Sequence, residues 1–159
     1  MFYFKYKSKI GDLYIYADNQ DILEISYYKN KEDYIEKETK LIKKAYSQIS
    51  EYLDNKRKSF DLPLKIQATD FQKEVYDYLS KISYGKVKTY KEVAKAINHK
   101  KAYRAVGSAC NKNKFSIVIP CHRVISSSNK LLGYAGGLDK KEALLKLEGL
   151  EIIDKAVKG

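Results

Sequence analysis

Residues 89–110 read TYKEVAKAINHKKAYRAVGSAC, and this stretch decides the fold of the half of the chain that contains it. Thr89 and Glu92 have the spacing of a capping box, which marks the start of a helix. Apolar side chains then recur every three or four residues in two short runs, separated by the break at residues 98–100. Two short helices joined by about three residues, with small side chains along the second, predict a helix-turn-helix.

The two runs differ in what they place on the opposite side of each helix. The predicted core positions are Tyr90, Val93, Ala94 and Ile97 in the first helix and Ala102, Ala105, Val106 and Ala109 in the second. The second helix turns Lys101, Arg104 and Ser108 away from that core. A basic stripe on a slim helix suits a nucleic-acid groove, although many helical hairpins bind nothing.

The charge of the chain is concentrated around this helical pair. The net charge is +11, and residues 1–63 are nearly balanced, with 12 basic and 11 acidic side chains. Residues 81–130 hold 12 basic side chains and one acid, Glu92. A local surplus equal to the whole net charge favours a face that binds a polyanion over a merely lysine-rich surface.

The flanking segments predict an α+β protein with two domains. Residues 2–7 and 12–27 alternate apolar and polar residues as strands do, and a helical apolar pattern, Ile35 included, follows to Leu53. The turn-rich segment 54–64 reads as a linker, and residues 69–82 predict a further capped helix. We therefore expect a small N-terminal β-sheet domain with a helix over residues 1–63. A mainly helical C-terminal domain containing the helix-turn-helix should occupy residues 64–159.

Composition excludes several classes of protein. No run of about 18 apolar residues occurs, and the N-terminus lacks the apolar core of a signal peptide. Two cysteines and two histidines, without zinc-site spacing, predict neither a disulfide framework nor a metal site. We therefore expect a cytoplasmic protein that binds no membrane and no metal.

The segment IVIPCHRVI, residues 117–125, carries the candidate nucleophile Cys121 beside His122. Pro120 stiffens the preceding backbone, and a histidine next to a cysteine in positive surroundings favours a lowered thiol pKa. A thiolate is the form that attacks carbon. Cys110, at the end of an apolar helical row, instead reads as a buried and inert cysteine. Neighbouring side chains of an extended strand point to opposite faces, so these residues alone leave nucleophile and buried hydrophobe both open for Cys121.

Five motifs resemble one family, the O6-alkylguanine-DNA alkyltransferases, also called methylated-DNA–protein-cysteine methyltransferases. They are GKVKTYKEVA (85–94), RAVGSACNKN (104–113), IPCHRVI (119–125), GYAGGL (133–138) and KEALLKLEG (141–149), and they occur in the family's order and spacing. The resemblance runs from about Phe71 to Glu148. The N-terminal part resembles the family only in character.

The resemblance implies a set of catalytic and substrate-binding roles. Cys121 accepts the alkyl group by in-line displacement at carbon, His122 acts as base through a bridging water, and Glu148 orients that histidine. Tyr90 donates a hydrogen bond to the base, and the backbone N–H of Ala135 donates to the departing oxygen. Backbone groups near Cys121 and Val124 read the exocyclic amine of the guanine.

The resemblance also implies how DNA is bound. The damaged nucleotide leaves the duplex for a pocket, and Arg104 enters the stack in its place. The helix that carries Arg104 lies in the minor groove, with Lys91 and Ser127 toward the DNA backbone. Lys101, on the basic side of the predicted second helix, is a further DNA-binding candidate. Asn113 is a structural hinge that ties the helix-turn-helix to the active-site strand.

The expected activity is single-use repair of double-stranded DNA that contains O6-alkylguanine, and less readily O4-methylthymine, by a monomer that needs no cofactor. The main alternative is a non-catalytic alkyltransferase-like protein that binds damage. Those proteins usually carry tryptophan at the position of Cys121. A plain helix-turn-helix DNA binder and a cysteine hydrolase are further alternatives. The former leaves the Cys-His-Glu set unexplained, and the latter needs no basic helix.

Overall fold

A computed structural model describes residues 1–158 and divides the chain into two compact units. The first unit contains residues 1–67 together with residues 114–118, and the second contains residues 68–113 and 119–158. We propose a domain boundary near residue 63, as the sequence predicts, with the short segment 114–118 as part of the N-terminal domain.

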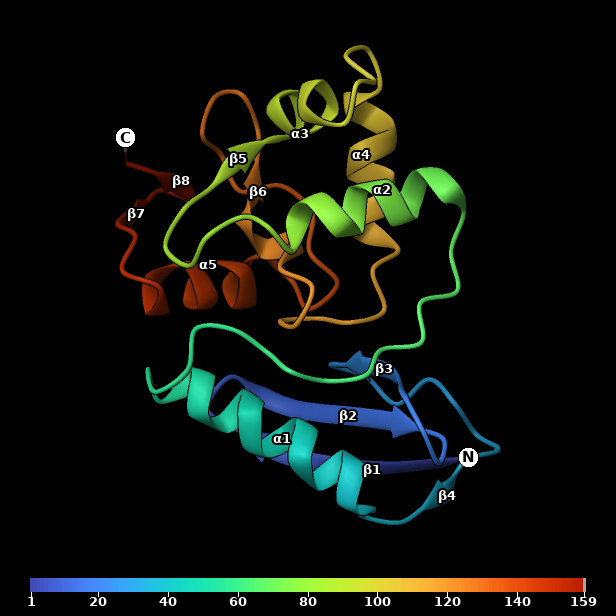
Figure 1. The fold of residues 1–159 in the computed structure, drawn as a ribbon. Coiled ribbons are helices and arrows are strands. Elements are labelled where there is room, and N and C mark those ends of the chain that lie inside the picture. Colours follow the sequence, from blue (N-terminus) through green and yellow to red (C-terminus); the bar gives the residue numbers. More distant parts are fainter. Residues whose placement is uncertain (159) are drawn as a thin grey trace. The chain divides into compact units, whose positions relative to one another are not determined.

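The N-terminal unit is a four-stranded sheet accompanied by one helix (Figure 1). Its elements are β1 (Phe2–Ser8), β2 (Gly11–Ala17), β3 (Ile22–Ser26), β4 (Ile35–Glu36) and α1 (Lys40–Leu53). The strand order is β3-β2-β1-β4, with β1 antiparallel to β2 and parallel to β4. Segment 114–118 adds an isolated bridge between Phe115 and Ile25 of β3.

The predicted strands are confirmed, but the predicted helical pattern began too early. Ile35 lies in the edge strand β4 and is 60% exposed. The helix α1 starts at Lys40 because the Thr39 side chain accepts a hydrogen bond from the Ile42 backbone N–H, as an N-cap does. Apolar spacing alone does not separate a strand residue from a helix residue when only one turn is in question.

The C-terminal unit is mainly helical and contains the predicted helix-turn-helix. Its elements are α2 (Asp70–Leu79), β5 (Lys88–Thr89), α3 (Tyr90–Ala96), α4 (Tyr103–Asn111), the 3-10 turn η1 (Cys121–Arg123), β6 (Val124–Ile125), α5 (Leu138–Leu147), β7 (Ile152–Ile153) and β8 (Ala156–Val157). Both predicted capping boxes, at the starts of α2 and α3, are present. With the sheet-containing first unit, this arrangement is the predicted α+β fold.

One predicted core position of α4 is wrong, because Ala105 is exposed. Cys110 is buried in α4 as predicted, together with Val106 and Ala109. In α2, Tyr76 is buried, and its hydroxyl donates to the Ala109 carbonyl oxygen at 2.8 Å. This hydrogen bond joins α2 to α4.

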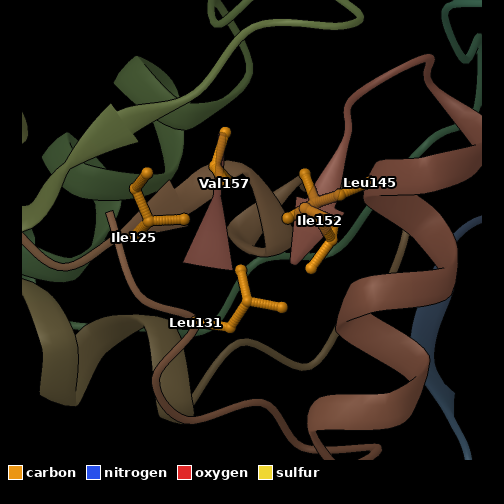
Figure 2. Close-up of a cluster of buried hydrophobic side chains, with 5 residues drawn as sticks. All are labelled: Ile125, Leu131, Leu145, Ile152 and Val157. Atoms are coloured by element: carbon orange, nitrogen blue, oxygen red, sulfur yellow. The ribbon is translucent and has the colours of Figure 1, made fainter. Parts of the chain in front are cut away.

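One hydrophobic cluster fixes the segments on either side of the site (Figure 2). Its side chains come from β6, from the segment between β6 and α5, from α5 and from the hairpin β7–β8. They are Ile125, Leu131, Leu145, Ile152 and Val157. The cluster holds β6, which follows Cys121, against α5, whose C-cap is Glu148.

In the described part of the chain, none of the helices has the length and apolar character needed to cross a membrane.

Candidate active site

The predicted catalytic residues lie in η1 and at the C-terminal end of α5. Cys121 and His122 belong to a single 3-10 turn that follows Pro120, so they do not alternate as in an extended strand. Glu148 is the C-cap of α5. The His122 Nε2 atom lies 2.8 Å from Glu148 Oε2, and both side chains are fully buried. Tertiary packing therefore brings together residues that lie 26 positions apart.

Arg123 completes this buried group, although the sequence analysis gave it no role. Its Nε donates to Glu148 Oε1 at 2.9 Å and its Nη2 donates to Glu148 Oε2 at 3.0 Å. Its Nη1 donates to the Ile82 carbonyl oxygen at 2.7 Å. The backbone N–H of Gly85 donates to Glu148 Oε1 at 2.9 Å. The available signal was an arginine directly after a Cys-His pair, because a buried positive charge needs a buried partner.

These contacts determine the protonation state of His122. Burial is the main effect that lowers the pKa of His122, and the adjacent Arg123 adds to it, while the hydrogen bond to Glu148 opposes it. The imidazole is therefore neutral near pH 7. Because Glu148 pairs with Arg123 as a carboxylate, it accepts the Nε2 proton, and the lone pair of the ring is then on Nδ1.

Cys121 is a buried thiol, with only 6% of the residue exposed. Burial raises its pKa, while the Asn113 amide and the charge of Lys141 act in the opposite direction. The expectation of a lowered thiol pKa is therefore wrong, because desolvation of the thiolate outweighs the nearby donors. The thiol keeps its proton at rest and must lose it during a reaction.

Asn113 contacts the predicted nucleophile, Cys121, directly. Its Nδ2 donates to Cys121 Sγ at 3.2 Å and to the Ile119 carbonyl oxygen at 2.9 Å. The second contact joins the segment after α4 to the segment before η1, as the hinge role requires. The first is a role that the sequence analysis missed, since it needs the distance between two side chains.

Lys141 is a second residue that the sequence analysis missed. It is fully buried, and its Nζ donates to the carbonyl oxygens of Leu132 at 2.7 Å and Gly133 at 3.3 Å. The same Nζ lies 5.9 Å from the centre of the Tyr90 ring. Burial lowers the pKa of Lys141 to about 8. The signal in the sequence was a lysine at an inward position of α5, three residues after Leu138 and three before Leu144.

Tyr90 begins α3, and its hydroxyl donates to the Leu132 carbonyl oxygen at 3.1 Å. Both residues line a hollow of about 490 Å³, a volume in the range of small-molecule sites. The lining residues are Tyr90, Tyr103, Arg104, Gly107, Ser108, Asn111, Leu132 and Gly133. The predicted substrate contact Tyr90 and the predicted DNA contact Arg104 thus share one hollow.

The other predicted residues lie in different parts of the second unit. Val124 is buried in β6, where it pairs with Lys88. Lys91 and Lys101 are exposed on and near the helix-turn-helix. Ser127 and Ala135 are exposed in the segment between β6 and α5. Among residues 1–158, no group of three or more His, Cys, Asp or Glu side chains is arranged to hold a metal ion.

Two family models match the chain. Residues 70–150 match the DNA binding domain of 6-O-methylguanine DNA methyltransferase, and residues 1–66 match its ribonuclease-like domain. The chain is 45% identical over 154 residues to a methylated-DNA–protein-cysteine methyltransferase of Methanosarcina barkeri, covering 93% of this chain and 97% of that protein. It is 37% identical to the Haemophilus influenzae protein of the same name, over 98% of this chain and 90% of that protein.

Solved structures give the same result. A Mycobacterium tuberculosis OGT in complex with DNA superposes with a TM-score of 0.87 at 34% identity, over 93% of this chain and 92% of that chain. The Atl1 protein of S. pombe, in complex with damaged DNA containing O6-carboxymethylguanine, superposes with a TM-score of 0.50 at 32% identity, over 55% of this chain and 83% of that chain. The fold and these matches define a class of DNA repair methyltransferases. The chain belongs to the methylated-DNA–protein-cysteine methyltransferase family.

Proposed function

We propose that this protein repairs duplex DNA by moving the methyl or alkyl group of O6-alkylguanine, and less readily of O4-methylthymine, onto Cys121 Sγ. The observation that carries the proposal is the buried hydrogen bond by which Glu148 orients the neutral His122, the residue that follows Cys121 in η1. The family membership of the whole chain supplies the reaction type.

The chemistry begins with the proton of the Cys121 thiol. His122 takes this proton on Nδ1 through a bridging water, and Glu148 stabilises the resulting imidazolium. The sulfur anion then attacks the alkyl carbon in line, forming the S–C bond as the C–O bond breaks. The bonding electron pair passes to the guanine O6. The thioether at Cys121 has no route back, so each molecule acts once and uses no cofactor.

Negative charge that develops on the departing purine needs donors, and the site offers several. The Tyr90 hydroxyl and the backbone N–H of Ala135 take the roles of donors to the base and to its oxygen. Burial raises the pKa of Tyr90, so its hydroxyl is protonated and able to donate. Lys141, close to the Tyr90 ring, places a positive charge near the developing negative charge.

For the base to bind, the Tyr90 hydroxyl must exchange its hydrogen bond to Leu132 for one to the base. The Tyr90 hydroxyl is bonded to the Leu132 carbonyl oxygen in this structure, and Cys121 is nearly inaccessible. We propose that the extruded base enters the hollow beside Tyr90 and takes over this hydroxyl. The Leu132 oxygen keeps the Lys141 ammonium as its donor, so the exchange leaves no carbonyl without a partner.

DNA binding is assigned to the helix-turn-helix. We propose that α4 lies in the minor groove, that Arg104 fills the gap left by the extruded nucleotide, and that Lys91, Lys101 and Ser127 contact the backbone. The DNA complexes of M. tuberculosis OGT and S. pombe Atl1 support a DNA partner. We further propose that the protein is a monomer. We also propose a cytoplasmic location, because a reactive thiol that must stay reduced suits that compartment.

The non-catalytic alternative is less well supported. The S. pombe Atl1 structure covers 55% of this chain, against 93% for M. tuberculosis OGT. This chain also retains a cysteine at position 121.

Peptide mass mapping tests the proposal. After incubation with duplex DNA containing O6-methylguanine, the peptide that holds Cys121 should carry one added methyl group, at no more than one equivalent per protein. Cys121→Ala should bind the same duplex and transfer nothing. Repeated turnover, or transfer by Cys121→Ala, would show that the nucleophile or the single-use mechanism has been wrongly assigned.

A further inference from the structure

Tyr103 lies where two hollows of the DNA-binding unit meet. It is the first residue of α4, half-buried, and precedes Arg104. One hollow is the one that Tyr90 and Arg104 line. The other is lined by Tyr103 and the four lysines Lys91, Lys95, Lys100 and Lys101. Tyr103 is the residue that both linings share, and none of the roles implied by the family resemblance falls on it.

Two cations from different helices meet this ring. Lys91 Nζ of α3 lies 5.3 Å from the centre of the Tyr103 ring, and Arg104 Cζ of α4 lies 5.8 Å from it. Both distances fall within the range of about 6 Å in which a ring face attracts a cation.

The surroundings of the ring favour a phosphate partner. The residues that line the lysine hollow include no carboxylate. Glu92, the acid nearest in sequence, accepts a hydrogen bond from the Thr89 backbone N–H in the capping box of α3. Cations gathered without a counter-charge repel one another until DNA phosphates neutralise them. The face of the Tyr103 ring attracts two of these cations, Lys91 and Arg104, and so holds them there.

We propose that Tyr103 is a positioning residue for DNA repair, whose ring holds the Arg104 guanidinium and the Lys91 ammonium in place before DNA arrives. This inference rests on the proposed function, in which Arg104 enters the base stack and Lys91 contacts the backbone. A long side chain that is already held loses less conformational freedom when it inserts, so the ring speeds nucleotide extrusion. It takes no part in the chemistry at Cys121.

The test compares Tyr103→Ala with the matched control Tyr103→Phe, which keeps the ring and loses only the hydroxyl. The rate constant for methyl transfer to Cys121 is measured with an O6-methylguanine duplex and with free O6-methylguanine base. We expect Tyr103→Ala to slow transfer from the duplex about threefold to tenfold and to leave transfer from the free base unchanged. Tyr103→Phe should match the wild type on both substrates.

A double-mutant cycle with Arg104→Ala gives the readout that a merely structural role would not move. Tyr103→Ala should cost less in the Arg104→Ala background than in the wild type, because one of the two held cations is gone. Equal loss on both substrates, a Phe variant as slow as the Ala variant, or fully additive losses would each overturn the inference. A wild-type protein that transfers no methyl group from either substrate would instead overturn the proposed function.

Discussion

At the scale of single residues, Glu148 organises the site. It accepts hydrogen bonds from the His122 ring, from two nitrogens of Arg123 and from the Gly85 backbone. A carboxylate held by this many donors is immobile, and so it fixes the orientation of the imidazole. Positioning of His122 thus depends on a charge pair that is itself buried, in which each partner is costly without the other.

Glu148→Gln should separate the role of Glu148 in orienting His122 from its role in pairing with the buried charge of Arg123. Loss of the carboxylate leaves Arg123 with an uncompensated buried charge, so the free energy of unfolding should fall by about 3–5 kcal/mol. The rate of methyl transfer should fall about 10- to 100-fold, because His122 loses its orienting acceptor. Urea unfolding and single-turnover kinetics measure the two effects.

The double variant Arg123→Met, Glu148→Gln is the control for Glu148→Gln. It removes both charges and should recover much of the stability but none of the transfer rate. Recovery of transfer would show that Glu148 only balances the charge of Arg123.

Burial of the Cys121 thiol predicts how stability and alkylation depend on pH. The pKa of Cys121 is raised in the folded protein, above a value of about 8.5 for the unfolded chain. Folding therefore keeps its full stability below that unfolded pKa and loses stability as the pH rises from there toward the folded pKa. In the Cys110→Ser background, iodoacetamide should modify Cys121 of the native protein far more slowly at pH 8 than it modifies a small free thiol. Mass spectrometry across pH 6–10 should show the rate still rising at the alkaline end. A rate that levels off at pH 6 would indicate a low-pKa thiolate.

At the scale of elements, short helices depend on their caps. The seven-residue helix α3 begins with Tyr90 directly after its N-cap Thr89, whose side chain accepts from the Glu92 backbone N–H at 3.0 Å. A helix of two turns cannot offset a missing cap with its own length. The position of Tyr90 in the site is therefore set by the cap hydrogen bond of Thr89, the residue before it.

Thr89→Ala should test this dependence. We expect a loss of about 1 kcal/mol in the free energy of unfolding and slower methyl transfer, because the first turn that carries Tyr90 frays. Thr89→Ser keeps the accepting hydroxyl and should behave as the wild type in both thermal unfolding and transfer. If the Ser variant is as impaired as the Ala variant, packing of the Thr89 methyl group and not the cap explains the loss.

Gly107 of α4 offers the opposite case, in which stability and function should diverge. A Cβ added there would lie 3.8 Å from two atoms of the Tyr90 ring, an ordinary van der Waals contact. Gly107→Ala should therefore stabilise the protein by about 0.5–1 kcal/mol through helix propensity. It should also slow repair of duplex DNA, because Gly107 lines the hollow beside Tyr90. Calorimetry and duplex repair rates test the two parts, and a destabilised variant would contradict the first.

At the scale of the whole molecule, the distribution of charge predicts the salt dependence of DNA binding. The surplus of positive charge lies in residues 81–130, which include the helix-turn-helix, while residues 1–63 are nearly neutral. Non-specific affinity for duplex DNA should therefore come from the second unit through its lysine and arginine side chains on the phosphates.

Two matched double variants test this assignment, because each removes the same total charge. Lys95→Gln, Lys100→Gln should lower the slope of log affinity against log salt by about 0.9 for each DNA phosphate that the protein no longer neutralises. Lys43→Gln, Lys44→Gln on α1 should leave the slope unchanged. Fluorescence anisotropy with an unmodified duplex over a range of salt provides the measurement, and equal effects of the two pairs would contradict a localised DNA face.

Much of the fold was predictable because its signals are local. The capping boxes at Thr69 and Thr89, the strands β1 to β3 and the helix pair α3–α4 depend on residues within a few positions of one another. Interactions of that range leave their pattern in the sequence itself. The start of α1 was missed because the apolar period continues through Ile35, whereas the Thr39 cap determines where the helix begins.

By itself, the sequence determined the α+β class, the helix-turn-helix and its basic face, and the family that the Cys-His segment indicates. Only the tertiary structure decided that Cys121 is a protonated thiol, that Arg123 and Lys141 are buried, and that Tyr90 is bonded to Leu132. The physical reason is that desolvation and ion pairing depend on every atom within a few ångströms. Those atoms come from segments far apart in the chain, and no local pattern of residues records their distances.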